Sequence, residues 1–133
     1  MAREVSTIAF SAALVFAAAR CSSPTDSLPS GAVAFSAPAI YATWWGEVEQ
    51  CSGKTGDFAA ISWYYVPGQG DFTVGSNPDI VGVWQAFNHS ITLAQSVWEN
   101  ADVVRHEELH AILQRGDHPP EYFVQKCGSI VAH

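Results

Sequence analysis

Two histidines four residues apart, inside the segment with the clearest helical pattern, constrain this 133-residue chain more than any other feature. The pattern predicts a helix from about Asn100 to Gln114, because Asn100 can cap its first turn and Gly116 can take the left-handed position after its last. His106 and His110 then project from the same side of the helix, one turn apart. Any fold of this chain must therefore accommodate two neighbouring imidazoles on one helix face.

These histidines belong to a His-Glu-x-x-His motif, which predicts a zinc site. Two imidazoles one turn apart can both reach an ion at about 2.0–2.1 Å, and imidazole is a ligand that suits Zn²⁺. Glu107 follows the first histidine and is expected near the metal without ligating it, where it can accept a proton from a zinc-bound water. The alternative is a solvated helix with two surface histidines; against it, His106 and His110 share the apolar face with Val103 and Leu113.

A third ligand is expected just after this helix. A catalytic zinc needs three protein ligands and one position open to water. The candidates are Asp117, His118 and Glu121. His118 is preferred, since Pro119-Pro120 stiffens the segment that would hold its imidazole beside the helix end. Asp117 is the alternative ligand, or a carboxylate that orients a ligating histidine. His89 is expected at a turn, and His133 in a frayed terminus.

The segments before the motif predict the remaining elements of an α+β domain. Ser36 can cap a helix that ends near Gly53 and buries two tryptophans. The residues of Phe58–Val66 are mostly aromatic or β-branched and predict a strand. Ile80–Phe87 and Ile91–Ala94 predict two more strands, joined as a hairpin. We expect a small, mostly antiparallel sheet of about three strands with one backing helix.

This order of elements, ending in a helix that carries the motif, resembles a minimal version of the zincins, the superfamily of HExxH metallopeptidases. The resemblance implies zinc-dependent hydrolysis of peptide bonds, with His106, His110 and His118 as ligands and Glu107 as the base. It also implies that an edge strand, here Ile91-Thr92-Leu93-Ala94, lies antiparallel to a bound peptide and presents backbone groups to it.

Other functions suit the same fold. A non-catalytic exported protein could bind zinc or a peptide there, and its zinc would be structural and closed by four protein ligands. A third interpretation is an envelope lipoprotein that holds no metal. Tyr122 is considered as a donor to the oxyanion of a peptidase, although tyrosine is more often a packing residue.

The first 35 residues differ in kind from the rest. Residues 1–21 contain an early arginine and an apolar run from Ile8 to Ala19, which is typical of a signal peptide and too short to span a membrane. Cys21 then resembles the lipidated cysteine of a bacterial lipoprotein, which would tether the chain to a membrane; a buried N-terminal helix is the alternative. Residues 22–35 are rich in small residues and proline, and predict a flexible linker to a domain at 36–133.

Three cysteines suit an exported protein. In an oxidising compartment Cys51 and Cys127 can form a disulfide, which leaves Cys21 for a lipid. Such a bridge would close a loop of about 75 residues and contribute roughly 4 kcal/mol to stability. The alternative is that Cys51 and Cys127 are free buried thiols.

Composition and net charge limit the classes of partner that the chain is expected to bind. Apolar residues make up 48% of the chain, so it can bury one core, and the formal net charge is −7. No run of lysine or arginine offers a surface for nucleic acid or anionic lipid. We expect a monomer that acts on a peptide or protein substrate, either anchored in the cell envelope or secreted.

Overall fold

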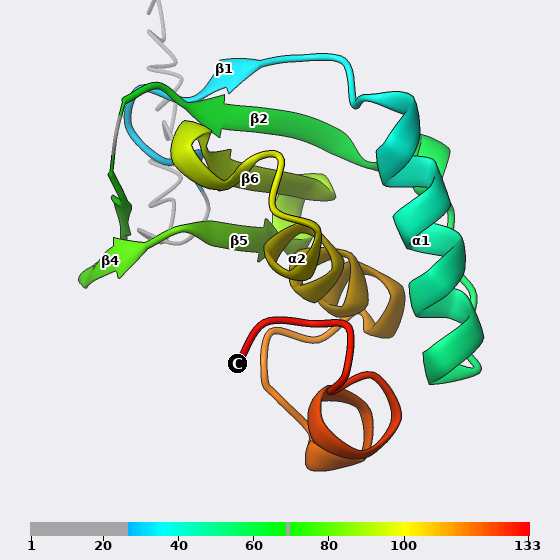
Figure 1. The fold of residues 1–133 in the computed structure, drawn as a ribbon. Coiled ribbons are helices and arrows are strands. Elements are labelled where there is room, and N and C mark those ends of the chain that lie inside the picture. The colour runs from blue at the N-terminus through cyan, green and yellow to red at the C-terminus, as the bar shows by residue number, and fades with distance from the viewer. Residues whose placement is uncertain (1–26, 69) are drawn as a thin grey trace, which may run out of the picture.

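The computed structural model of the chain describes residues 27–68 and 70–133. Two main helices pack together beside a mixed four-stranded sheet, and a two-stranded hairpin lies apart from it (Figure 1). The α+β class is as predicted. Within the described residues, no helix has the length and apolar character needed to cross a membrane. The predicted signal peptide, residues 1–21, and the lipidation site Cys21 lie outside the described residues.

The sheet has the strand order β1-β2-β6-β5. β1 (Val33–Ala34) is antiparallel to β2 (Ser62–Val66), which is parallel to β6 (Ser90–Ala94), and β6 is antiparallel to β5 (Gly82–Gln85). The β5–β6 pair confirms the predicted hairpin. Two of the three pairings are antiparallel, and the sheet is mixed because β6 runs parallel to β2. It has four strands, where about three were predicted.

Two predicted strands are shorter than the sequence pattern indicates. Phe58–Ala60 forms a 3₁₀ turn, η1, so β2 begins only at Ser62. The segment predicted as one strand from Ile80 is divided between the end of β4 (Asn77–Ile80) and β5, and a second 3₁₀ turn, η2 (Ala86–Asn88), follows. β4 pairs with β3 (Phe72–Val74) in the separate hairpin.

His89 is exposed, has a φ of 50° and ends η2. This confirms its prediction as a turn residue.

Part of the predicted linker belongs to the folded domain. Val33 and Ala34 of β1 pair with Tyr65 and Tyr64 of β2. The domain therefore begins before residue 36. Residues 27–35 are not a free tether, because even a short strand of small residues can complete the edge of a sheet.

Helix α1 (Ala39–Ser52) covers one end of the sheet. It ends at Gly53, which is left-handed with a φ of 70° as predicted, but Pro38 rather than Ser36 occupies the N-cap position. Its buried residues are Tyr41, Trp45, Val48 and Ser52.

Helix α2 (Ala101–Leu113) carries the histidine motif, and its first turn is as predicted. The Asn100 side chain accepts hydrogen bonds from the backbone N–H groups of Asp102 and Val103. The left-handed residue at its end is Gln114, with a φ of 54°, and not Gly116, so the helix stops two residues earlier than that glycine implies.

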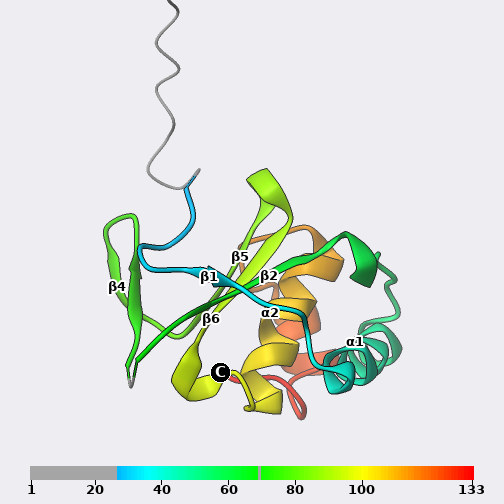
Figure 2. The ribbon, with the colours of Figure 1, turned by 90° about the horizontal axis from the view of Figure 1, so that it is seen from above.

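Seen from above, α1 lies beside α2, and strands of the sheet pass over α2 (Figure 2). The buried apolar side chains of the core come from the two helices, the sheet and the segment after α2. α2 packs against α1 on one side and against β5 and β6 on the other. A short π-helix, η4 (Glu121–Lys126), follows α2, and the next residue, Cys127, forms a disulfide with Cys51 of α1 as predicted. The principal core side chains are Tyr41, Trp45, Val48, Trp63, Trp84, Ile91, Leu93, Val104, Leu109, Ile112, Phe123 and Cys127.

Candidate metal centre

Three imidazoles converge beside α2. The Nε2 atoms of His106 and His110 are 3.2 Å apart, because residues four apart on a helix project to the same side. His118 follows the helix and places its Nε2 atom 3.0 Å from that of His106 and 3.2 Å from that of His110. These three side chains form a cluster that could hold a metal ion, and they are the three that the sequence predicted.

The other ring nitrogens of the two helical histidines are bonded to backbone carbonyls. His106 Nδ1 lies 2.8 Å from the carbonyl oxygen of Ala132, and His110 Nδ1 lies 2.7 Å from that of Arg115. A carbonyl oxygen only accepts, so in each neutral ring we assign the hydrogen to Nδ1. Each ring then turns an Nε2 lone pair toward the others, which is the usual arrangement of histidines that ligate a metal.

The spacing of the three Nε2 atoms suits a tetrahedral metal. Atoms that lie about 2.0–2.1 Å from Zn²⁺ at tetrahedral angles are about 3.3 Å from one another. The observed separations of 3.0–3.2 Å are close to this value. Three lone pairs at such distances repel one another unless a cation or protons lie between them, so the donor set fits a zinc ion.

Burial keeps the helical imidazoles neutral. It lowers the pKa of His110 to about 4, and it is also the main cause of the lowered pKa of His106. Neutral imidazole is the form that ligates a metal. At neutral pH a cation therefore has no proton to displace from these two Nε2 atoms.

Asp117, the alternative third ligand, pairs with Arg115 and is not part of the cluster. Its exposed carboxylate accepts two hydrogen bonds from the Arg115 guanidinium, at 2.8 and 2.7 Å. The potential metal-binding group contains His118 and not Asp117. Asp117 is therefore not a ligand in this arrangement, because a guanidinium two residues away offers it a bidentate partner.

Glu107 points from α2 toward the edge strand β5. It is 5% exposed, and a Cβ atom placed on Gly82 would lie 2.7 Å from its Oε1, so the missing side chain at residue 82 makes room for the carboxylate. Burial raises the pKa of Glu107 to about 8, and a hydrogen bond from the Trp84 backbone opposes that shift. The carboxylate lies outside the three-histidine group, in keeping with a role other than ligation.

A cavity of about 490 Å³ borders the cluster. All three histidines and Glu107 line it, together with residues of β5, the β3–β4 hairpin and the C-terminal segment. A metal held by the three imidazoles would therefore face a space that can admit part of a substrate. The apolar lining residues include Val74, Ile80, Val81, Val83, Trp84 and Val103.

The predicted substrate-binding strand is wrongly placed. Ile91, Thr92, Leu93 and Ala94 lie in β6, which is buried throughout and hydrogen-bonded on both sides, to β2 and to β5. A central strand has no free backbone groups to offer a peptide. The edge strand beside the cavity is β5, and the error arose because the parallel pairing of β2 with β6 was not foreseen.

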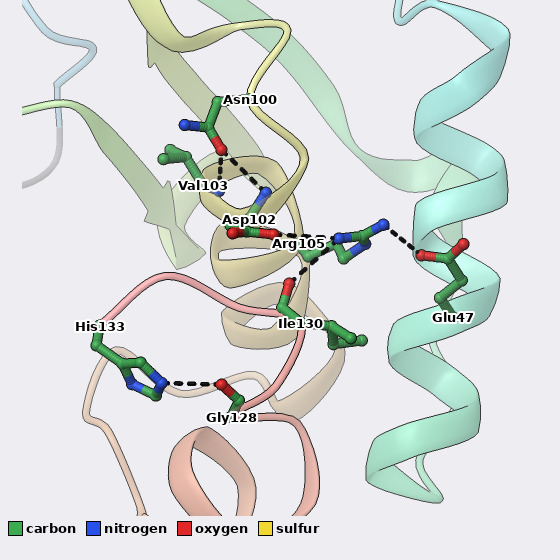
Figure 3. A network of polar contacts seen from close by, with 8 residues as sticks. All are labelled: Glu47, Asn100, Asp102, Val103, Arg105, Gly128, Ile130 and His133. Atoms are coloured by element: carbon green, nitrogen blue, oxygen red, sulfur yellow. Dashed lines mark hydrogen bonds and ion pairs between the residues drawn. The ribbon is translucent and has the colours of Figure 1, made fainter.

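The C-terminal residues pack on α2, which corrects the expectation of a frayed terminus at His133. The His133 Nε2 atom lies 2.9 Å from the carbonyl oxygen of Gly128, and the Ala132 N–H donates to the carbonyl of Asp102 at 3.0 Å. Arg105 links this segment to α2 and to α1 (Figure 3). The segment thereby brings the Ala132 carbonyl to His106.

Three residues of the site were not foreseen from the sequence. Gly82 appears in the pattern only as a weak point of a strand, and this is the one signal that could have drawn attention to it. Ala132 acts through its backbone, and Phe123, which packs beneath the imidazoles, resembles any other core aromatic. Only the fold brings these three residues to the histidines.

Comparisons with models of protein families, with curated proteins and with solved structures found no match to this chain.

Proposed function

We propose that this chain is a minimal zincin-like peptidase that hydrolyses peptide bonds with the help of zinc. One observation carries the proposal: three Nε2 atoms converge within 3.2 Å beside a cavity that also contains a buried carboxylate, that of Glu107. A structural zinc is normally closed by four protein ligands, whereas the group found among the described residues contains three. This favours a site that leaves one position for water or substrate.

Zinc is the proposed ion because three neutral imidazoles at this spacing match its preferred ligands and geometry. Bound there, it would polarise a scissile carbonyl and lower the pKa of a water molecule toward about 7. The chain contributes the fixed orientation of its ligands. Two of the three imidazoles are held by hydrogen bonds to backbone carbonyls. These two side chains therefore lose little conformational freedom when the metal binds.

Glu107 is the proposed general base. It would accept a proton from the attacking water and pass it to the leaving amine. Its pKa, about 8 as a result of burial, would fall beside a cation, which leaves an ionised carboxylate that is still basic near neutral pH. The absence of a side chain at Gly82 leaves the space in which the carboxylate lies.

We propose that the substrate is a peptide in extended conformation, bound along β5. β5 pairs with β6 on one side only, and its residues Gly82, Val83 and Trp84 line the cavity. Backbone groups at the free edge of a sheet can bind an added strand. The largely apolar wall favours uncharged substrate side chains.

We also propose that the protein acts outside the cytoplasm. The disulfide between Cys51 and Cys127 supports this, because such bonds persist in oxidising compartments. A signal peptide at residues 1–21 and a lipid on Cys21 are the corresponding proposals for the N-terminal region.

Glu107→Gln tests this function, because it preserves the shape of the side chain and removes its basicity. We expect unchanged zinc content and a loss of peptide hydrolysis of about 10²–10⁴-fold, the usual contribution of a general base. Glu121→Gln, at an exposed carboxylate paired with Lys126, is the matched control and should keep full activity.

Two outcomes would overturn parts of the proposal. Retained turnover in zinc-loaded Glu107→Gln would remove Glu107 from the mechanism. A zinc-loaded wild-type protein that binds peptides but cleaves none in a broad library would instead support the non-catalytic binding protein.

A further inference from the structure

Phe123 packs against all three imidazoles of the cluster. Its ring centroid lies 5.0 Å from that of His106, 4.6 Å from that of His110 and 4.8 Å from that of His118. Phe123 is itself 4% exposed, so its ring is part of the core as well as a surface for the histidines. One apolar side chain thus borders every member of the cluster.

His118 lacks the anchors that the other two histidines have. His106 and His110 are fixed by α2 and by Nδ1 hydrogen bonds to backbone carbonyls. His118 lies in the connecting segment after the helix and is exposed. Among the described residues, the hydrogen bonds and ring–ring contacts of its imidazole are with the two other imidazoles and with Phe123.

Phe123 is also held by contacts outside α2. It lies in the π-helix η4, a rare element that is often found at functional sites. The residue after η4, Cys127, is bonded to Cys51 of α1, and the Phe123 N–H donates to the Pro119 carbonyl at 3.1 Å. The ring therefore reaches the cluster from a part of the fold that is covalently tied to the other helix.

We propose that Phe123 is a positioning residue, which holds His118 in the orientation for ligation and so sets the metal affinity of the site. The inference rests on the metal site of the proposed function and adds a residue that does not itself touch the ion. Without the ring, the segment around His118 must be ordered when the metal binds, and that entropy is subtracted from the binding free energy.

The test is zinc affinity, measured by competition with a chelator on the full chain. Phe123→Ala should bind zinc about 10–100-fold more weakly, the usual effect of removing a group that orients a ligand. Phe123→Leu, which keeps an apolar side chain, should restore most of the affinity. Val124→Ala is the control, because Val124 is adjacent but 61% exposed, and it should match the wild type.

A double-mutant cycle separates positioning from general packing. If Phe123 acts through His118, Phe123→Ala should have little further effect on zinc affinity in a His118→Ala background. The cobalt spectrum of fully loaded Phe123→Ala should resemble that of the wild type, because His118 still ligates, whereas that of His118→Ala should differ. An equal loss in both backgrounds would overturn the role of Phe123. So would wild-type affinity in Phe123→Ala, or in Phe123→Leu a loss as large as that of alanine.

The outcome also distinguishes this inference from the metal site on which it rests. A wild-type chain that takes up no zinc would remove the site itself. Tight zinc binding by the wild type together with unchanged affinity in Phe123→Ala would remove only the role of Phe123.

Discussion

The Glu107 carboxylate occupies the space that a side chain at Gly82 would need. A Cβ atom on residue 82 would lie 2.7 Å from Oε1 of Glu107 and 2.9 Å from its Cγ, closer than packed atoms approach. The edge strand and the carboxylate are neighbours only because residue 82 is glycine. Glycine generally weakens a strand, but at residue 82 it leaves the space that the Glu107 carboxylate occupies.

Gly82→Ala should therefore displace Glu107 and leave the three imidazoles in place. The backbone of Gly82 is not left-handed, so alanine can adopt it without strain. We expect kcat for peptide hydrolysis to fall by about 10–100-fold, as small displacements of catalytic groups do, with zinc affinity unchanged. Both quantities should be measured on the same preparations.

Gly46→Ala is the matched control, because a Cβ there, in α1, has nothing within 4 Å. It should keep kcat and raise stability by about 0.5–1 kcal/mol, since alanine favours a helix interior. Unchanged kcat in Gly82→Ala would contradict the contact between Gly82 and Glu107.

The disulfide is expected to support both the fold and the site. Replacing Cys51 and Cys127 together by alanine should lower the free energy of unfolding by about 4 kcal/mol, the chain-entropy value for cysteines 76 residues apart. Zinc affinity should fall as well, because Cys127 follows the π-helix that carries Phe123. Urea denaturation and chelator competition measure the two effects, and a variant equal to the wild type in both would contradict the expectation.

Two buried glutamates should make the metal-free protein less stable as the pH rises. Glu108 is fully buried, neither of its carboxylate oxygens has a hydrogen-bond partner, and burial raises its pKa to about 9. The folded chain holds this proton more tightly than the unfolded chain. The stabilisation is therefore complete below the ordinary pKa of 4.5 and is lost as the pH rises through about 9. Glu107, with a pKa of about 8, acts in the same direction.

His110 acts in the opposite sense and at lower pH. Its pKa is lowered to about 4 from 6.5, so its contribution to stability is lost as the pH falls through that window. Between pH 7 and 9 the glutamates dominate, and the free energy of unfolding of the metal-free protein should decrease. Denaturant titrations at several pH values test this, and Glu108→Gln, which cannot ionise, should flatten the decline. An equally steep decline in that variant would show that Glu108 does not titrate as its burial implies.

The parts of the fold that depend on local sequence were predictable. Asn100 caps α2 through its side chain, and the helical spacing of His106 and His110 places their Nε2 atoms together. His118 was also expected at the cluster, because the segment that carries it is short and stiffened by two prolines. In each case the interacting residues are at most 12 apart along the chain.

The parts that depend on long-range pairing were not predictable. β1 was expected in a linker, since its small residues join the sheet only through β2, about 30 residues later. Because β6 pairs in parallel with β2, Ile91–Ala94 lie in the centre of the sheet and not at its edge, where they were predicted. The Ala132 carbonyl lies beside His106 Nδ1, although the two residues are 26 apart in the sequence. Because Ala132 contributes a backbone group, no side-chain pattern indicates this contact.

Zinc stoichiometry in equilibrium dialysis tests the central claim most directly, because the whole account depends on one ion shared by three imidazoles. The wild type and His89→Ala, at an exposed turn histidine, should each bind one zinc per chain. His118→Ala, at the exposed histidine of the cluster, should bind zinc far more weakly while keeping its fold. No zinc uptake by the wild type, or equally tight uptake by His118→Ala, would contradict the account.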